Sequence, residues 1–382
     1  MRLRDESKSE MAANRRKFLK AGAATAAGVA GAGALGFPMV SRAQTVTLKM
    51  QGAWGAKDIF NQYARDYVKR VNEMGGGRLK ITYLVAGSVV KPWQIQDAVH
   101  KGVLDAGHQV TAYWYGKNKA ASLFGTGPVF GQNAHHTLAW IQYGGGQALY
   151  EELVQKILGL NLVGFFCMPM PAQPLGWFKK RIKSAKQLRG LKYRTVGLAA
   201  DIMQTAGLKV NQLPSGKIAS ALESGVIEAF EYNNPTSDKS FGAQDVSKVY
   251  MMGSYHQAMD FFEIIFNKSK YESLAKEHQA ILKYAAEAAS TANFGLAMDS
   301  YSRDLQRLIN LYGVKVYRTP ESVMRAQLKA WDKVLRRKLM KDPYVVKVLE
   351  SQRAWAMRVA FYELLNSPDY KLAYEHYFGK LF

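Results

Sequence analysis

Two histidines and one cysteine are the first residues of this sequence to test for chemistry. His135 and His136 are adjacent, so they point away from each other on a helix and cannot ligate one metal, and no H-E-x-x-H pattern occurs. Cys167 is the only cysteine and lies in a continuous apolar run, where burial keeps a thiol unreactive. The sequence also lacks the G-x-S-x-G pattern of a nucleophilic serine. Neither catalytic zinc nor nucleophilic catalysis is predicted.

The glycine runs at 75–77 and 144–146 do not have the pattern of a phosphate-binding loop. Neither has the lysine and serine of a P-loop or the glycine spacing that follows the first strand of a dinucleotide-binding unit. We interpret them as a turn and a helix break. Carboxylate pairs that hydrolyse glycosides meet in space rather than along the chain. An exported hydrolase acting on an acidic substrate therefore stays an alternative.

The charge balance favours an anionic partner. The chain of 382 residues has 52 Lys and Arg against 30 Asp and Glu, and a formal charge of +17 remains without the first 43 residues. Such a charge attracts a nucleic acid, a membrane surface or a small acid, and the alternative is a solvated basic surface without a specific partner. The length and the 48% of hydrophobic residues predict a folded chain of two lobes.

The N-terminal segment predicts export. Arg15 and Arg16 precede an Ala- and Gly-rich apolar run that ends at Ala43, a pattern that resembles a twin-arginine signal peptide with cleavage near Ala43. A retained membrane anchor is the alternative, although the run is poor in Leu and Ile. Export would place the protein in the periplasm and disfavours nucleic acid as a partner. With Cys167 alone, no intramolecular disulfide is possible.

Alternating strands and helices must position any binding residues. Residues 46–50 alternate as a strand, 58–74 have apolar residues at helical spacing, and 79–85 form the next strand. A buried strand is expected over 160–169, and further strand and helix patterns follow from 191. The last of these is a strand over 225–235 that stops at a polar turn. The pattern predicts an α/β fold with largely parallel sheets in two lobes, with a ligand cleft between them.

Two helical regions complete the pattern. Residues 276–313 contain no proline and predict a helix long enough to brace both lobes. From 343 to 382 the chain is helical apart from Pro368 and rich in Trp, Tyr and Leu. This tail packs either on its own chain or on a second subunit.

Several segments together resemble the solute-binding component of TRAP transporters, the tripartite ATP-independent periplasmic type, in the branch that binds 2-oxo acids and related carboxylates. The resemblance covers most of residues 45–300 and rests on MPMPAQPLGWFKK, LRGLKYRTVGLAADIM, LPSGKIASALESGVIEAFEYNNP, GHQVTAYWYGKNKA and YGGGQALYEEL. It implies a two-lobed α/β periplasmic-binding-protein fold with a hinge, a long helix spanning the lobes and a helical C-terminal tail. Members are receptors rather than enzymes, and they deliver a solute to membrane permease subunits.

The resemblance also implies a division of the chain. Residues 1–43 are the signal peptide and 44–168 form lobe 1 with a connecting helix. Residues 169–231 are the core of lobe 2, inserted into lobe 1, and 232–312 cross back, complete both lobes and include the long helix. Residues 313–382 are the helical C-terminal region, through which members of the branch form homodimers.

A carboxylate and cation site is the second implication of the resemblance. Arg194 matches the family arginine, whose planar guanidinium donates two parallel hydrogen bonds to a carboxylate. Gln173, Glu231 and the main-chain oxygen of Tyr232 match the cation ligands. This set of oxygen ligands suits sodium or calcium rather than zinc.

Aromatic residues complete the implied site. Tyr113, Trp114 and Tyr115 resemble the aromatic patch of the first lobe, and Trp54 follows the first strand at the edge of the cleft. The branch has Trp where this chain has Tyr232. A main-chain ligand survives that change, but the shape of the pocket does not, so the identity of the acid stays open. A sensory receptor with the same pocket is a further alternative.

Overall fold

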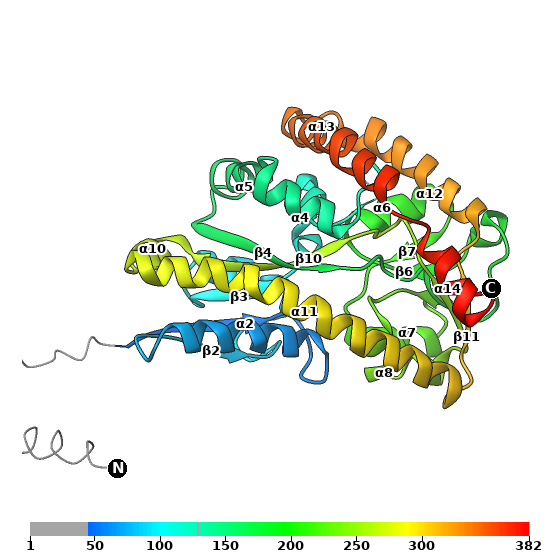
Figure 1. Ribbon diagram of the computed structural model, residues 1–382, viewed down its shortest axis with the longest axis horizontal. Coiled ribbons are helices and arrows are strands. Elements are labelled where there is room, and N and C mark those ends of the chain that lie inside the picture. The colour runs from blue at the N-terminus through cyan, green and yellow to red at the C-terminus, as the bar shows by residue number, and fades with distance from the viewer. Residues whose placement is uncertain (1–44, 128–129, 382) are drawn as a thin grey trace, which may run out of the picture. The chain divides into compact units, whose positions relative to one another are not determined.

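Two sheets organise the protein in the computed structural model, which describes residues 45–127 and 130–381 (Figure 1). The predicted signal peptide and its cleavage near Ala43 lie outside the described residues. The first sheet has the strand order β2-β1-β3-β10-β4, with β1 Val46–Gly52, β2 Leu79–Leu84, β3 Ala106–Gln109, β4 Leu162–Met170 and β10 Asp260–Asn267. The second has the order β11-β9-β5-β8-β6-β7, with β5 Gly176–Phe178, β6 Lys192–Arg194, β7 Lys209–Asn211, β8 Ala229–Phe230, β9 Val249–Met252 and β11 Lys315–Arg318. We call the parts built on these sheets lobe 1 and lobe 2.

The sheets are largely parallel, as predicted, but each contains one strand that is antiparallel to both of its neighbours. In lobe 1 this strand is β10, which pairs with β3 and β4. In lobe 2 it is β5, which pairs with β8 and β9. Both form directly after the chain has crossed from the other sheet. The reversed strands therefore mark the two crossings that enclose the site.

Helices of different lengths cover the sheets. The α-helices are α2 Phe60–Met74, α3 Ile95–His100, α4 Ala134–Tyr143, α5 Gly146–Glu151, α6 Gly197–Thr205, α7 Ile218–Glu223, α8 Pro235–Ser240, α9 Ala243–Val246, α10 Lys268–Glu272, α11 Lys276–Asn310, α12 Glu321–Val334, α13 Pro343–Asn366 and α14 Tyr370–Phe378. The short 3₁₀ and π segments are η1 Pro92–Gln94, η2 Thr111–Trp114, η3 Lys119–Phe124, η4 Glu152–Ile157, η5 Ala185–Leu188, η6 Ser215–Lys217 and η7 Leu335–Leu339. No helix in the described part of the chain is long and apolar enough to cross a membrane.

The predicted strand–helix–strand start of lobe 1 is confirmed by β1, α2 and β2. Tyr63, Tyr67 and Val71 lie one helical turn apart on α2 and are fully buried against the sheet. Trp54 and Phe262 add aromatic rings to the same core, with 5.0 Å between ring centroids. This packing fixes the loop after β1, which carries Trp54 toward lobe 2.

The strand expected over 225–235 is much shorter than predicted. Only Ala229 and Phe230 belong to β8. The next four residues leave the sheet, and Asn234 caps α8 by accepting a hydrogen bond from Ser237 N at 2.9 Å. The early end of β8 releases residues 231–234 from strand pairing, so that they can contribute to a site.

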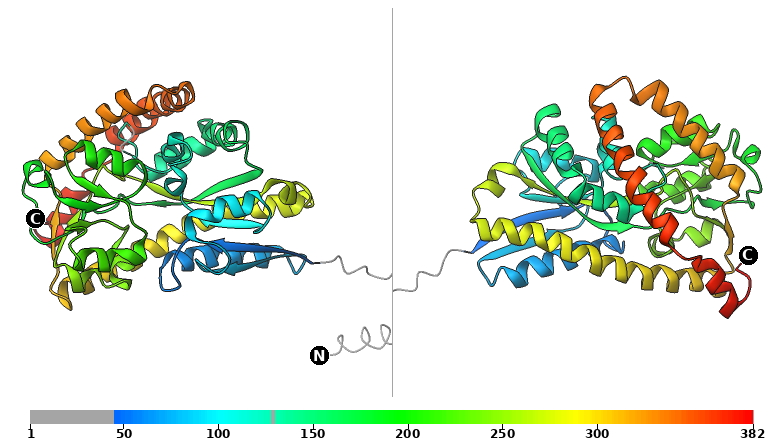
Figure 2. Two further views of the ribbon diagram at one scale, coloured as in Figure 1. Left: turned by 180° about the vertical axis from the view of Figure 1, so that it is seen from behind. Right: turned by 45° about the horizontal axis from the view of Figure 1, so that its top comes forward.

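The long helix α11 joins the lobes, as predicted. It has 35 residues and contacts α2 and β4 of lobe 1 and α8 of lobe 2. Figures 1 and 2 show it running beside both lobes. The segment from α12 to α13 also spans the lobes, because α12 packs on α6 and α13 packs on α4 and η3.

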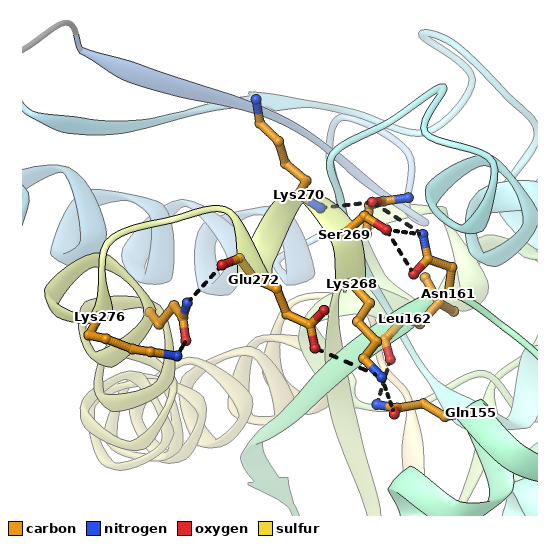
Figure 3. Close-up of polar contacts among 10 residues, drawn as sticks. Gln155, Asn161, Leu162, Lys268, Ser269, Lys270, Glu272 and Lys276 are labelled. Carbon is orange, nitrogen blue, oxygen red and sulfur yellow. Dashed lines mark hydrogen bonds and ion pairs between the residues drawn. The ribbon is translucent and has the colours of Figure 1, made fainter.

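Polar contacts hold the lobe 1 end of this helical brace (Figure 3). Lys268 at the start of α10 donates a hydrogen bond to Gln155 Oε1 at 2.9 Å, and Gln155 Nε2 donates to Leu162 O on β4 at 3.0 Å. Asn161 Nδ2 donates to Ser269 Oγ at 3.0 Å. These contacts tie α10, which directly precedes α11, to the edge strand β4.

The C-terminal tail exposes apolar side chains. Beyond its contacts with lobe 1, α13 presents Met357, Phe361, Tyr362, Leu364 and Leu365 to solvent, each at least 65% exposed. Helix α14 continues with exposed Tyr370, Leu372, Tyr377 and Phe378. An apolar surface of this extent is typical of a helix that contacts a partner.

Candidate functional site

A small cavity lies between the lobes, where strands of both sheets end. Its volume is about 30 Å³, and its lining residues are Trp54, Phe60, Val110, Ala112, Tyr113, Gln173, Arg194, Val196, Tyr232, Asn233, Gln257 and Asp260. Most of them directly follow β1, β3, β6 or β8, the usual place for ligands in α/β sheets. Gln173 and Gln257 come from the two crossing segments. So little space fits only a small ligand.

The two crossing segments lie side by side. Gln173 N donates a hydrogen bond to Gln257 O at 2.9 Å, which links the turn after β4 to the turn before β10. Gly176 then packs tightly on lobe 2, because a Cβ at this position would lie 2.0 Å from Phe230 O. Its φ of +113° also favours glycine. This close approach sets Gln173 beside the residues that follow β8.

Arg194 is held at the end of β6 with only one nitrogen unengaged. Its Nε donates to Leu213 O at 2.8 Å, and its Nη1 donates to Glu231 O at 2.7 Å and to Glu231 Oε1 at 3.1 Å. Among the described residues, Nη2 has no acceptor. The side chain is 2% exposed and lines the cavity. The predicted two-nitrogen fork is thus partly occupied by the protein, which leaves the two N–H groups of Nη2 for a ligand.

The Gln173 amide lies within a cluster of oxygen atoms. One terminal atom of this amide is 2.9 Å from Glu231 Oε2, 3.1 Å from Gln257 Oε1 and 3.1 Å from Tyr232 O. The other terminal atom is 2.9 Å from Asn233 Nδ2 and 3.2 Å from Gln257 Nε2. With the amide nitrogen toward the three oxygens, every contact is a hydrogen bond. With the amide oxygen there, four oxygens converge and need a cation.

The spacing of these oxygens fits a hard cation. Neighbouring ligands of an ion that binds oxygen at about 2.4 Å lie roughly 3.4 Å apart when they subtend a right angle. The distances of 2.9–3.1 Å around the Gln173 amide are somewhat shorter than this value and equal those of N–H···O hydrogen bonds, so this spacing fits either an amide nitrogen or a cation with closely packed ligands. No group of three or more His, Cys, Asp and Glu side chains suited to a metal occurs in the described residues. The donor set is therefore one carboxylate with amide and carbonyl oxygens, which suits calcium or sodium.

Burial controls the charge of Glu231. Burial raises the pKa of this carboxyl to about 7, although the Arg194 guanidinium pulls it in the opposite direction. Near neutral pH the group therefore exchanges a proton easily. The Arg194 guanidinium therefore offsets only part of the cost of burying the Glu231 carboxylate, and a second positive charge beside this carboxylate would stabilise its ionised form.

Two hydrogen-bonded contacts join the lobes beside the cavity. Asp58, in the loop after β1, accepts hydrogen bonds from Tyr232 OH at 2.5 Å and from Ser237 Oγ at 2.9 Å. Tyr115 OH donates to Asp201 Oδ2 on α6 at 2.8 Å. Because each contact has one partner in each lobe, both form only when the lobes are together.

The structure brings most of the predicted residues together. Arg194, Gln173, Tyr232, Trp54 and Tyr113 line the cavity, and Glu231 lies directly behind Arg194.

Trp114 and Tyr115 have other neighbours. The Trp114 indole donates to Glu263 Oε2 at 2.9 Å inside lobe 1, and Tyr115 joins the lobes through Asp201. As ligand contacts, these two residues stay predictions without support from this arrangement.

Sequence reasoning missed Gln257 and Asp260. Both belong to the segment GSYHQAMDFF, where the family pattern is not recognisable. Their position in the chain could have indicated them. The segment with Gln257 leads into β10 at the second crossing, and the segment with Gln173 follows β4 at the first crossing.

Two lobes that enclose one arginine and a cluster of oxygens define a two-lobed solute-binding protein. Residues 50–342 match the family model described as bacterial extracellular solute-binding protein, family 7, so the chain belongs to this family. The resemblance to TRAP solute-binding proteins is confirmed. The family consists of periplasmic binding proteins and not enzymes, which removes the hydrolase alternative.

Known relatives resemble the chain over most of its length. The monocarboxylate 2-oxoacid-binding periplasmic protein of Nostoc sp. is 32% identical over 309 residues, which cover 81% of this chain and 83% of the relative. A TRAP solute-binding protein from Colwellia psychrerythraea, solved with bound calcium and pyruvate, is 30% identical to this chain with a TM-score of 0.79. The match covers 88% of this chain and 100% of the Colwellia chain.

Two further solved structures share the fold. One from Pseudoalteromonas atlantica, with bound sodium and pyruvate, is 28% identical with a TM-score of 0.79, covering 88% of this chain and 100% of its own. A dimer from Bordetella bronchiseptica, with calcium and picolinate in one active site, is 28% identical with a TM-score of 0.80, covering 87% of this chain and 97% of its own. The predicted two-lobed fold is therefore confirmed.

Proposed function

We propose that this protein binds a small 2-oxo acid together with a calcium or sodium ion and delivers the acid to a TRAP permease. The observation that carries the proposal is the convergence of oxygens around Gln173 in the cavity where Arg194 Nη2 has no protein acceptor. An arginine N–H pair and a cation are complementary to one carboxylate head group. Relatives whose structures hold pyruvate with calcium or sodium support the choice of ligand.

The residues that would hold the cation are Glu231 through a carboxylate oxygen, Gln173 and Gln257 through amide oxygens, and Tyr232 through its main-chain oxygen. The ion would supply positive charge for the acid head group. The protein itself contributes Arg194 Nη2, the walls formed by Trp54 and Tyr113, and exclusion of water when the lobes close. Closure requires the ligand to contact both lobes, because only a difference in affinity shifts the equilibrium from open to closed.

Calorimetric titration tests the proposal directly. The mature protein, freed of metal by a chelator, is titrated with pyruvate in buffers that contain calcium, sodium or neither. We expect binding that depends on the cation and that is lost in Arg194→Ala. Arg181→Ala is the matched control, because Arg181 is an exposed arginine that lies over the Tyr317 ring outside the cavity. Equal binding by Arg194→Ala and the native protein would contradict the proposal.

Transport distinguishes this proposal from a sensory role with the same pocket. Deletion of the chain from its host should abolish high-affinity uptake of the acid that calorimetry identifies. Unchanged uptake, together with a lost transcriptional response to that acid, would instead indicate a sensory receptor.

We also propose that the C-terminal helices form a homodimer. The support is the row of exposed apolar side chains on α13 and α14, and one solved relative is described as a dimer. Leu364→Glu with Leu365→Glu should shift the mass in light scattering from dimer to monomer. Leu311→Glu is the control, because Leu311 is equally exposed, at 73%, but directly follows α11 and is not part of α13 or α14. A native protein that is monomeric at micromolar concentration would contradict the dimer.

Export by the twin-arginine route is a further proposal from the sequence of residues 1–43. Arg15→Lys with Arg16→Lys should retain the protein in the cytoplasm, and the mass of the exported native protein should correspond to a chain that begins near Gln44. Export of the double variant at the native level would contradict this route.

A further inference from the structure

Asp260 places a second carboxyl group at the wall of the cavity. It is the first residue of β10, where the chain returns to lobe 1, and it pairs with Met170 at the end of β4. The residue is 2% exposed and lines the cavity together with Arg194, Gln173 and Tyr113. Asp260 is thus within the same enclosure as the groups that would hold an acid.

The hydrogen bonds of Asp260 are incomplete. Its Oδ1 accepts one bond, from the main-chain N of Phe261 at 2.8 Å. Its Oδ2 has no hydrogen-bond partner among residues 45–127 and 130–381. A buried carboxyl group with only one donor is unusual, since buried polar atoms normally find partners. A ligand group could supply the missing bond.

The Asp260 carboxyl group is buried and closely packed on the side of Gly125. Burial raises the pKa of this carboxyl well above its usual range. A Cβ added at Gly125 would lie 3.0 Å from Asp260 Oδ1 and 2.8 Å from Thr111 Oγ1. Thr111 Oγ1 is itself buried without a partner in the described structure, so a further polar atom lies near Asp260 on the side of Gly125.

We propose that Asp260 is a specificity-determining residue that hydrogen-bonds a hydroxyl group of the bound acid, so that the protein selects small hydroxylated 2-oxo acids. This inference rests on the proposed function, because it assumes that Arg194 and the cation hold the carboxylate head of the same ligand. A hydroxyl group can donate a hydrogen bond to Asp260 Oδ2, for which the described residues supply no donor.

The protein would discriminate between a hydroxylated acid and its methyl analogue through the hydrogen bond that the analogue cannot make to Asp260. A ligand with a methyl group at this position fills the space but leaves Asp260 Oδ2 buried without a partner. A site built to hydrogen-bond a hydroxyl group rejects an analogue that lacks it more strongly than an apolar pocket rejects a change of one methylene. We expect a preference of about tenfold or more for the hydroxylated acid.

The test compares 3-hydroxypyruvate with 2-oxobutyrate, which carry a hydroxyl and a methyl group at the same position. Both are titrated calorimetrically with calcium into the native protein, Asp260→Asn and Asp260→Val. The native protein and Asp260→Asn, which keeps a donor and an acceptor, should bind 3-hydroxypyruvate at least about tenfold more tightly. Asp260→Val should lose or reverse this preference while still binding 2-oxobutyrate. Asp245→Val, at an exposed aspartate of lobe 2, is the control and should keep the native ratio.

The outcomes separate this inference from the proposed function. If both acids bind with calcium but the native ratio is near one, or if Asp260→Val keeps the native preference, the role of Asp260 is overturned and the proposed function stands. If neither acid nor pyruvate binds to the native protein with any cation, the proposed function fails and the inference fails with it. Thermal unfolding of each variant shows whether an unchanged ratio or a lost signal comes from folded protein.

Discussion

Two buried glutamates show how this fold uses a carboxyl group in two ways. Glu263 lies inside lobe 1, where its Oε2 accepts hydrogen bonds from Gln109 Nε2 at 2.8 Å and from Trp114 Nε1 at 2.9 Å, and its Oε1 accepts one from Tyr150 OH. Glu231 lies at the junction of the lobes, where its Oε1 accepts a bond from Arg194 and its Oε2 is 2.9 Å from the Gln173 amide. Both side chains are at most 1% exposed.

The difference lies in the number and kind of partners. Three neutral donors from three separate segments surround Glu263, so this carboxyl group ties β3, η2 and α5 to its own strand β10. Glu231 faces the Arg194 guanidinium and the Gln173 amide, beside which the oxygens of Gln257 and Tyr232 lie, and we propose that a cation binds among these oxygens. Burial alone therefore does not distinguish a structural carboxyl group from a binding one. The identity of the surrounding atoms does.

The largest expected effect is the loss of binding in Glu231→Gln. The substitution keeps the size of the side chain but removes the charge that the cation requires, so cation-dependent affinity for pyruvate should fall by at least ~100-fold, about 2.7 kcal/mol. Calorimetry measures this change. Because the substitution also leaves the buried Arg194 guanidinium without its carboxylate, the melting temperature of the ligand-free protein should fall, and affinity is compared at a temperature where the variant is folded.

Glu263→Leu should show the opposite behaviour. It leaves the Gln109, Trp114 and Tyr150 donors buried without an acceptor, and we expect the free energy of unfolding to fall by about 3 kcal/mol. Chemical denaturation measures this loss, and pyruvate affinity at a temperature where the variant is folded should be unchanged. A variant of Glu263 with native stability, or one that loses ligand affinity while folded, would show that the two carboxyl groups are not distinct.

The pH dependence of binding should follow Glu231. The pKa of this carboxyl is raised by burial to about 7 in the ligand-free protein, and a cation binds only the deprotonated form. As pH falls through 7, a proton competes with the cation. Affinity for calcium should therefore be about tenfold lower at pH 6 than at pH 8. Glu231→Gln should remove this dependence, whereas a flat profile in the native protein would argue against Glu231 as a ligand.

The smallest expected effect is that of Tyr232→Phe. The main-chain oxygen near the Gln173 amide is retained, but the hydrogen bond between Tyr232 OH and Asp58 of the other lobe is lost. We expect affinity to fall by a factor of about 3–10, expressed mainly as faster ligand dissociation in stopped-flow fluorescence.

Tyr193→Phe is the control for this variant, because the Tyr193 hydroxyl donates to Leu175 O within lobe 2. Equal dissociation rates in Tyr232→Phe and Tyr193→Phe would indicate that the contact between the lobes does not stabilise the closed state.

The sequence was sufficient to predict the two-lobed fold, the spanning helix and five cavity residues. Those five residues follow strands or lie at the first crossing between the lobes. At these places the strand pattern and the family motifs predict the same residues. The three consecutive aromatics at 113–115 were harder to interpret. In a 3₁₀ turn successive side chains diverge by about 120°, so Tyr113, Trp114 and Tyr115 face the cavity, the lobe 1 core and lobe 2 respectively.

The residues that the sequence did not reveal come from long-range packing. Gln257 reaches the Gln173 amide because the two crossing segments are hydrogen-bonded side by side, although 84 positions separate them in the sequence. Asp260 faces the same cavity because β10 begins there. The reversed direction of β10 and β5 also follows from the crossings, and no local periodicity encodes strand direction.

A crystal structure of the mature protein grown with calcium and pyruvate tests the central claim most directly. An anomalous difference map should show one ion at about 2.3–2.6 Å from oxygens of Gln173, Glu231 and Tyr232, with the pyruvate carboxylate on Arg194 Nη2. A map with ordered pyruvate but no ion among these oxygens, or with Arg194 turned away from the acid, would contradict the account.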